Sequence, residues 1–191
     1  MQEENKNKKD VPSNERKKFI DPKEIIQEAG IKEGDKIADF GCGPGYFSLP
    51  VASVVGEKGE VYALDVFPGA LESLESQAKM KGIDNISIKR VNLEKAGGSK
   101  LGDGSVDWVI LKHILFQNKD KKTIIDEANR VLRKDGKIII MEWNKNLVMG
   151  PDEKLRVDPV EIGELIMDSG FIFEKKIDAG NYHYVIIAEK S

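Results

Sequence analysis

Three glycines, at positions 41, 43 and 45, lie between a predicted strand and a predicted helix. Gly41 allows a tight turn, and glycine at 43 and 45 lets the backbone approach a ligand because no Cβ stands in the way. The spacing is G-x-G-x-G, and Tyr46 occupies the position where a dinucleotide-binding fingerprint has its third glycine. A glycine-rich loop in this context predicts a ligand site at the end of the strand.

Two carboxylates flank this loop. Asp39 precedes it, and a negative charge there would repel a pyrophosphate but attract a cationic amino-acid head. Asp65 ends the next predicted strand, where a carboxylate can accept both hydroxyls of a ribose or else cap the following turn. Val66 and Phe67 come next and can pack either on an adenine face or in the core.

His113 is the candidate general base. It follows the fourth predicted strand, and ligands of parallel sheets sit at the carboxyl ends of the strands. An unperturbed imidazole accepts a proton near neutral pH, although His113 can also serve only to pack or hydrogen-bond near a cofactor. Tyr182 and His183 begin the last predicted strand and either face a substrate or form ordinary strand surface.

Other reactive or aromatic residues near these positions admit plain structural roles. Cys42 lies inside the glycine loop, but the sequence shows no histidine to pair with it as a nucleophile. Glu142 and Trp143 follow the fifth predicted strand, and Trp143 either walls a substrate pocket or closes the core edge. Residues 144–157 lack regular periodicity, which suits a solvated connector or a lid. No paired-cysteine metal motif is present, and we expect no metal site.

These positions depend on a regular alternation of strands and helices. Apolar runs predict strands over 36–40, 60–65, 86–91, 106–111, 137–142, 171–178 and 183–189. Helical spacing and caps predict helices that begin after Asp21 and Asp158, and others over 45–55, 69–81 and 119–133. The expected fold is α/β: a doubly wound, mostly parallel seven-stranded sheet, Rossmann-like, with helices on both faces and an antiparallel C-terminal hairpin.

Length and composition predict one domain over residues 19–191. Residues 1–18 are almost entirely polar, and we expect a flexible tail or a lid there. A net charge of −3 argues against a general nucleic-acid binder, and no apolar run is long enough to span a membrane. The single cysteine and the absence of a secretory signal at the N-terminus predict a cytoplasmic protein.

The motifs together resemble the class I S-adenosylmethionine-dependent methyltransferases. The loop Asp-Phe-Gly-Cys-Gly-Pro-Gly with Asp65 is similar to the family's cofactor site, and residues 101–107 and 130–136 are similar to its approaches to the fourth and fifth strands. Among these enzymes the pattern most resembles the ubiquinone/menaquinone-biosynthesis type. The resemblance implies S-adenosyl-L-methionine as cofactor, S-adenosyl-L-homocysteine as product, and cofactor contacts from Asp39, Gly41, Cys42, Gly43, Gly45, Asp65, Val66, Asn92, Leu93 and Leu111.

Two departures from the family pattern affect the expected contacts. The family has an acidic residue after the third strand, near the adenine amino group, where this chain has Asn92 and Leu93. The Asn92 carbonyl can still accept from that amine, and the Leu93 backbone N–H can still donate to the ring. Asp135 replaces the usual proline and keeps an Asp-Gly turn.

The resemblance implies methyl transfer to a small-molecule acceptor by direct displacement, driven by proximity and desolvation. A base is then needed only if the acceptor must lose a proton. Leu-Lys-His-Ile stands where nucleic-acid amino-methyltransferases carry their motif, and we expect no nucleic-acid substrate. An NAD(P)-binding oxidoreductase and a non-catalytic S-adenosylmethionine-binding subunit are the alternatives, and a monomer or homodimer is expected.

Overall fold

The computed structural model describes residues 21–145 and 149–191. The predicted tail over 1–18 lies outside the described residues, as do three residues of the predicted connector. Among the described residues, no helix has both the length and the apolar character needed to cross a membrane.

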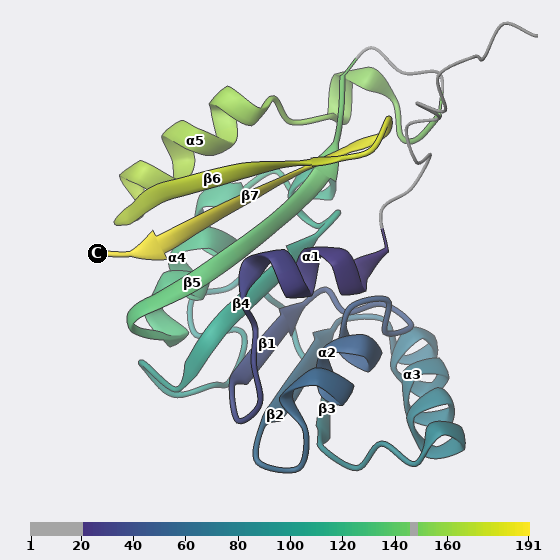
Figure 1. The fold of residues 1–191 in the computed structure, drawn as a ribbon. Coiled ribbons are helices and arrows are strands. Elements are labelled where there is room, and N and C mark those ends of the chain that lie inside the picture. Colours follow the sequence, from purple (N-terminus) through teal and green to yellow (C-terminus); the bar gives the residue numbers. More distant parts are fainter. Residues whose placement is uncertain (1–20, 146–148) are drawn as a thin grey trace, which may run out of the picture.

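One seven-stranded sheet organises the chain (Figure 1). Its strands are β1 (Lys36–Phe40), β2 (Glu60–Asp65), β3 (Ile86–Arg90), β4 (Val106–Lys112), β5 (Leu132–Trp143), β6 (Phe171–Ala179) and β7 (His183–Lys190). The order is β3-β2-β1-β4-β5-β7-β6, in which β1 to β5 pair in parallel and β7 runs antiparallel to both of its neighbours. This confirms the predicted fold class, including the antiparallel C-terminal hairpin.

Helices cover both faces of the sheet (Figure 1). They are α1 (Pro22–Ala29), α2 (Ser48–Val55), α3 (Pro68–Lys81), α4 (Lys121–Val131) and α5 (Pro159–Asp168), with short 3₁₀ turns η1 (Leu115–Gln117) and η2 (Glu153–Leu155). Apolar side chains of α1 and α2 pack on one face, and α3 joins α2 there through Leu74 and Leu49. Those of α4 and α5 pack on the other face, so the sheet is buried on both sides.

The capping residues predicted from the sequence for the starts of α1 and α5 are confirmed. The Asp21 carboxylate accepts the Lys23 N–H at 2.9 Å, and the Asp158 carboxylate accepts the Val160 N–H at the same distance. In both helices proline occupies the first turn, where its missing N–H costs nothing.

Two boundaries differ from the prediction by three residues or more, and the others differ by one or two at most. The helix expected from residue 45 begins at Ser48, because Gly45 has a φ of 96° and the glycine loop continues through Phe47. The strand expected from residue 137 begins at Leu132, because the Asp-Gly turn forms an irregularity inside the strand and does not precede it. Asp135 has a φ of 59° there, which aspartate tolerates better than most residues.

The topology brings the predicted functional residues to one edge of the sheet. The chain moves outward from β1 through β2 to β3, then returns to the other side of β1 as β4 and β5. The chain therefore leaves the carboxyl ends of the neighbouring strands β1 and β4 in opposite directions along the sheet. This is the switch point, where open parallel sheets bind ligands.

Candidate functional site

A cavity of about 740 Å³ opens at this edge of the sheet. That volume lies within the range of small-molecule sites, roughly 300–1,000 Å³. Segments after β1, β2, β3, β4 and β5 all contribute to its wall. The lining includes these residues predicted from sequence: Gly41, Gly43, Asp65, Val66, Asn92, Leu93 and His113.

Asp65 connects the end of β2 to the glycine loop. One carboxylate oxygen accepts the Gly43 N–H at 2.8 Å, and the other accepts the Phe67 N–H at 2.9 Å. The turn-capping role considered from sequence is thus present. Each oxygen has a second lone pair, so the carboxylate can also accept hydrogen bonds from a ligand in the cavity.

The glycines leave space beside the backbone, open to the cavity, that a side chain would fill. Gly41 and Gly43 line the cavity with φ values of 73° and 53°. A Cβ on Gly43 would meet no atom within 4 Å, and one on Gly41 would stand 3.0 Å from the Ile114 side chain. The loop therefore offers bare backbone beside an acidic group, which fits the ribose and amino-acid parts of an adenosyl ligand.

Four residues predicted as cofactor contacts lie behind the cavity wall. Leu111 is fully buried in the core, and Gly45 packs so closely under α3 that a Cβ would stand 2.5 Å from Leu74. Burial raises the pKa of the Cys42 thiol, which keeps it protonated and unreactive. Asp39 is also buried, and it accepts a hydrogen bond from the Ser48 hydroxyl at 2.6 Å.

The electrostatic state of Asp39 follows from that burial. Desolvation raises its pKa to about 6, against the lowering effects of the Ser48 hydroxyl and the Lys112 charge. Asp39 does not line the cavity, and its hydrogen bond from Ser48 joins the end of β1 to the start of α2.

Asn92 is exposed, and its side-chain carbonyl accepts the Glu94 N–H at 2.9 Å. This bond forms a local turn after β3. It uses one of the two lone pairs of the Asn92 carbonyl, which leaves one lone pair for the expected bond from an adenine amine. Glu94 also lines the cavity, so an acidic residue is present two positions beyond the expected one. Spacing alone did not identify Glu94.

His113 stands in the cavity wall in a constrained conformation. Its φ is 55°, a left-handed value that is uncommon outside glycine, and its backbone N–H donates to the Met141 carbonyl at 2.9 Å. Burial, with the charge of Lys112, lowers its pKa to about 3. The Lys112 ammonium donates to Nδ1 at 3.1 Å, so Nδ1 accepts and Nε2 carries the ring proton. A neutral ring with this pKa is a weak base.

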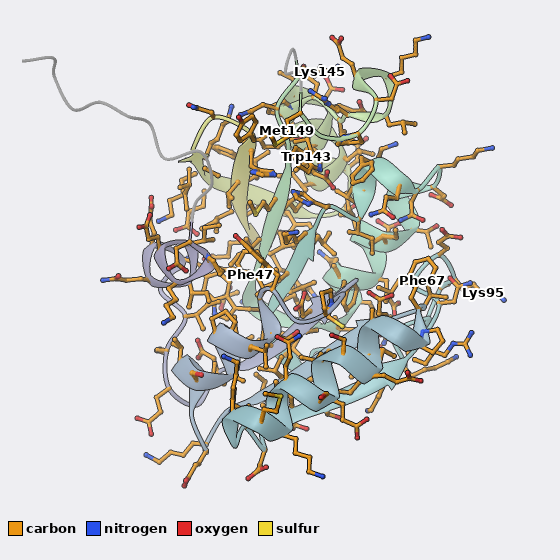
Figure 2. The ribbon with its side chains drawn as sticks, turned by 90° about the vertical axis from the view of Figure 1, so that its right-hand side faces the viewer. Phe47, Phe67, Lys95, Trp143, Lys145 and Met149 are labelled. Carbon is orange, nitrogen blue, oxygen red and sulfur yellow. The ribbon has the colours of Figure 1, made fainter. Side chains whose placement is uncertain are left out.

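Three rings meet at the ends of β4, β5 and β7. The His113 ring stacks on Trp143 and on His183, with centroids 4.7 Å and 4.8 Å apart. Trp143 lines the cavity, as one of its two sequence interpretations predicted, whereas His183 is buried behind it. Figure 2 shows Trp143 and Phe67 well apart, and both line the cavity.

Glu142 is a buried carboxyl that supports another part of the wall. Its Oε1 accepts the Leu115 N–H at 2.9 Å, which anchors η1 beside the cavity. Burial raises its pKa to about 7. Phe116 and Gln117 of η1 line the cavity, and sequence reasoning missed both because no periodic pattern marks so short a turn.

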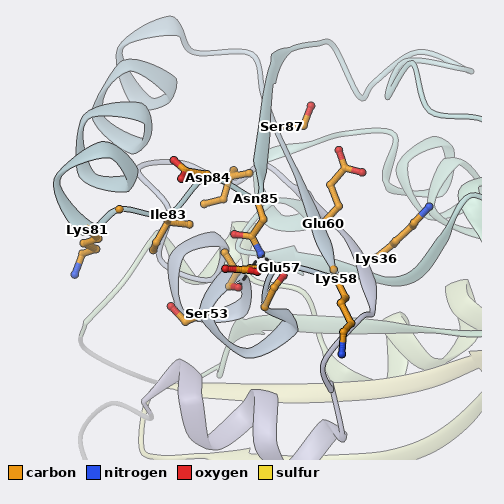
Figure 3. A pocket seen from close by; sticks show the side chains of 15 residues that line it. Lys36, Ser53, Glu57, Lys58, Glu60, Lys81, Ile83, Asp84, Asn85 and Ser87 are labelled. Carbon is orange, nitrogen blue, oxygen red and sulfur yellow. Dashed lines mark hydrogen bonds between the residues drawn. The ribbon is translucent and has the colours of Figure 1, made fainter.

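A second hollow of about 900 Å³ lies at the opposite edge of the sheet (Figure 3). Its charged side chains, among them Lys36, Lys58 and Glu60, point in different directions in Figure 3 and do not converge. Asn85 is held by the Ala52 and Gly56 carbonyls. This hollow therefore lacks the convergent polar groups of a binding site.

Residues 31–185 match a family model described as "Methyltransferase domain". The chain belongs to the methyltransferase domain family. The class I S-adenosylmethionine-dependent methyltransferase family predicted from the glycine loop and Asp65 is therefore confirmed, and neither alternative function gains support. Likeness to solved structures agrees on the fold: a SAM-dependent methyltransferase from Aquifex aeolicus has a TM-score of 0.84 at 24% identity, covering 91% of this chain and 92% of that one.

Curated relatives of this methyltransferase domain include enzymes of quinone biosynthesis. The demethylmenaquinone methyltransferase of Anoxybacillus flavithermus is 27% identical over 67% of this chain and 53% of its own length. The ubiquinone/menaquinone biosynthesis C-methyltransferase of Shewanella sp. (strain ANA-3) is 28% identical over 84% of this chain and 61% of its own. The chain thus spans about half the length of the first curated relatives it matches.

Proposed function

We propose that this chain transfers a methyl group from S-adenosyl-L-methionine to a small-molecule acceptor. The observation that carries the proposal is the contact between the glycine loop and Asp65 at the rim of the carboxyl-edge cavity. Bare backbone and a carboxylate converge there, as an adenosyl ligand requires. S-adenosyl-L-methionine supplies a methyl group on a positively charged sulfur, already activated for displacement.

The cofactor-holding residues in this proposal are those that line the cavity near β1, β2 and β3. Asp65 accepts from the ribose hydroxyls, and Gly41 and Gly43 allow close approach of the amino-acid end. Val66 and Phe67 are 44% and 66% exposed, so their side chains are free to cover an adenine face. Leu93 lines the cavity there, and Asn92 or Glu94 accepts from the adenine amine. Asp39, Cys42, Gly45 and Leu111 pack behind the wall and support it.

The acceptor would bind on the β4 and β5 side of the cavity. His113, Trp143 and Phe116 line that side, and they offer flat, largely apolar surface that excludes water. Because Nε2 of His113 bears the proton and the ring pKa is low, we assign His113 to placing the acceptor and not to removing its proton. The curated relatives are named for methylation in menaquinone and ubiquinone biosynthesis, which fits a small and partly apolar acceptor. We propose that the enzyme is cytoplasmic and acts as a monomer or homodimer.

A labelled-transfer assay tests this function. The protein is incubated with S-adenosyl-L-methionine carrying a tritiated methyl group and with fractions of a bacterial small-molecule extract. We expect label in low-molecular-mass material, and a large loss of transfer in the Asp65→Ala variant. The matched control is Glu72→Gln, an exposed carboxylate on α3.

Two results would contradict the proposal. Label that remains on the cofactor in every fraction, despite saturable binding, would favour a non-catalytic subunit. Saturable binding of reduced nicotinamide dinucleotide without binding of S-adenosyl-L-homocysteine would favour the oxidoreductase alternative.

A further inference from the structure

Lys112 places a positive charge in the wall of the carboxyl-edge cavity. It is the last residue of β4, and its side chain lines the cavity between the glycine loop and β5. The ammonium lies 3.1 Å from Nδ1 of His113 and 4.7 Å from the centroid of the Tyr46 ring. These contacts hold the side chain in place, half-buried, beside the space where ligands are expected.

The charge is not matched by an acid in contact. Among the described residues, Lys112 forms no ion pair with a carboxylate within 4 Å, and it is the one lysine or arginine in the described lining of the cavity. Of the two nearby buried acids, Asp39 accepts from the Ser48 hydroxyl and one oxygen of Glu142 accepts from the Leu115 N–H, while the other Glu142 oxygen has no hydrogen-bond partner in the described part of the chain. Neither carboxylate lies within 4 Å of the ammonium. An ammonium has three N–H donors, and the His113 ring uses one.

A half-buried ammonium without a contacting acid costs free energy, because burial removes water from the charge. Burial accordingly lowers the pKa of Lys112, while Asp39 and Glu142 act at longer range to raise it. A ligand that brought a negative charge into contact would offset that desolvation. A neutral ligand would bury the ammonium further with no compensation.

We propose that Lys112 is the anion-recognition residue of this cavity and binds a carboxylate or oxyanion of a ligand. The proposal deepens the proposed function and rests on it for the site's location. Two ligands can supply the anion: the aminocarboxylate end of the cofactor, toward Asp39 and Tyr46, or the methyl acceptor, toward His113 and Trp143. The chemistry at Lys112 is the same in both cases, and the test separates them.

The test compares paired ligands that differ in charge. The first pair is S-adenosyl-L-homocysteine and 5′-methylthioadenosine, which lacks the aminocarboxyl end. The second pair is 1-naphthoate and its neutral amide, titrated into protein saturated with S-adenosyl-L-homocysteine. Calorimetry gives each dissociation constant for the wild type, Lys112→Met, Lys112→Arg and the control Lys119→Met, which removes an exposed lysine outside the cavity.

We expect Lys112→Met to weaken the charged member of one pair by about tenfold or more, because a hydrogen bond to a charged group is lost. Its uncharged counterpart should change by less than about threefold, and Lys112→Arg should retain most of the affinity since the charge is kept. Loss confined to the first pair assigns the anion to the cofactor, and loss confined to the second assigns it to the acceptor.

Equal changes for both members of each pair, or no change in any, would overturn the proposal and leave Lys112 a structural contact of His113 and Tyr46. Thermal melts of each variant establish that the protein is folded. Failure of the wild type to bind either nucleoside would contradict the proposed function instead. The naphthoate pair, titrated in that case into protein without nucleoside, would then decide on Lys112 alone.

Discussion

The Asp65 carboxylate accepts the backbone N–H of Gly43 at 2.8 Å, across 22 residues of sequence. The residue expected to hold a ribose therefore also holds the loop expected to receive the rest of the ligand. Its second oxygen accepts the Phe67 N–H and fixes the start of the segment that carries the adenine-side wall. One side chain thus orders two walls of the cavity, and any variant of Asp65 changes both binding and loop geometry.

Replacing Asp65 should weaken ligand binding, and the loss should depend on how many acceptor atoms the new side chain keeps. Asp65→Ala removes the ribose acceptors and both loop contacts, and should weaken S-adenosyl-L-homocysteine binding by roughly 100-fold, as expected for losing charge-assisted hydrogen bonds. Asp65→Asn keeps one oxygen acceptor and should lose less. Calorimetry measures both, and equal dissociation constants for Asp65→Ala and wild type would remove Asp65 from the site.

His113 should remain neutral across the physiological pH range. Burial and the Lys112 charge hold its pKa at about 3, and burial lowers that of His183 to about 4. Because the chain has only two histidines, NMR of the ring nitrogens resolves them readily. Neither ring should titrate between about pH 5.5 and 8, and His113 should carry its proton on Nε2. A titration near pH 6.5 would contradict this assignment and restore His113 as a candidate base.

Glu142 should make stability depend on pH. Its pKa rises on folding from an ordinary value of 4.5 to about 7, so the folded state holds a proton that the unfolded state releases. Stability should therefore fall as pH rises through that window. Glu142→Gln should match the wild type near pH 5 and exceed its stability near pH 8, in urea unfolding at each pH.

The control for Glu142 is Glu164→Gln, an exposed carboxylate on α5. The difference between that variant and the wild type should stay nearly constant with pH. The Glu142 prediction fails if its own difference is equally flat, because a buried acid with a raised pKa cannot then be present. The lowered pKa values of the two histidines make stability rise with pH up to their unfolded value near 6.5. That contribution is the same in the wild type and both variants, so it cancels in the differences.

Arg156 should control the order of the segment that covers Trp143. Its buried guanidinium donates to the carbonyls of Pro151, Asn144 and Met149, at 2.9, 3.1 and 3.1 Å. Arg156→Lys cannot reproduce this planar set of donors, and should cost about 1–3 kcal/mol of unfolding free energy. Hydrogen exchange at residues 149–155 should quicken, whereas Arg133→Lys at an exposed site should leave it unchanged. Unaltered exchange in Arg156→Lys would refute the role.

Sequence alone predicted the parts of the site that depend on local patterns. Three glycines between a strand and a helix predict a tight turn with exposed backbone. Asp65 ends a strand that its own apolar residues make recognisable. Parallel-sheet topology then requires both to reach the same edge. Caps at Asp21 and Asp158 were visible because a capping bond joins residues two or three apart.

The rest of the site depends on contacts between distant residues, which no local pattern records. Glu142 and Leu115 are 27 residues apart, and Glu127 receives hydrogen bonds from Ser99, 28 residues away, to hold the loop after β3. The low pKa of His113 arises from burial against Trp143 and His183, which lie on β5 and β7, and from the charge of Lys112. Sequence showed a histidine at a strand end and could not show that its surroundings keep it neutral.

The most direct test of the adenosyl site at the glycine loop and Asp65 is calorimetric titration of the wild-type protein with S-adenosyl-L-homocysteine. We predict one saturable site with a micromolar dissociation constant, and no saturable signal from reduced nicotinamide dinucleotide. Absence of heat from S-adenosyl-L-homocysteine, on protein that circular dichroism shows to be folded, would contradict it.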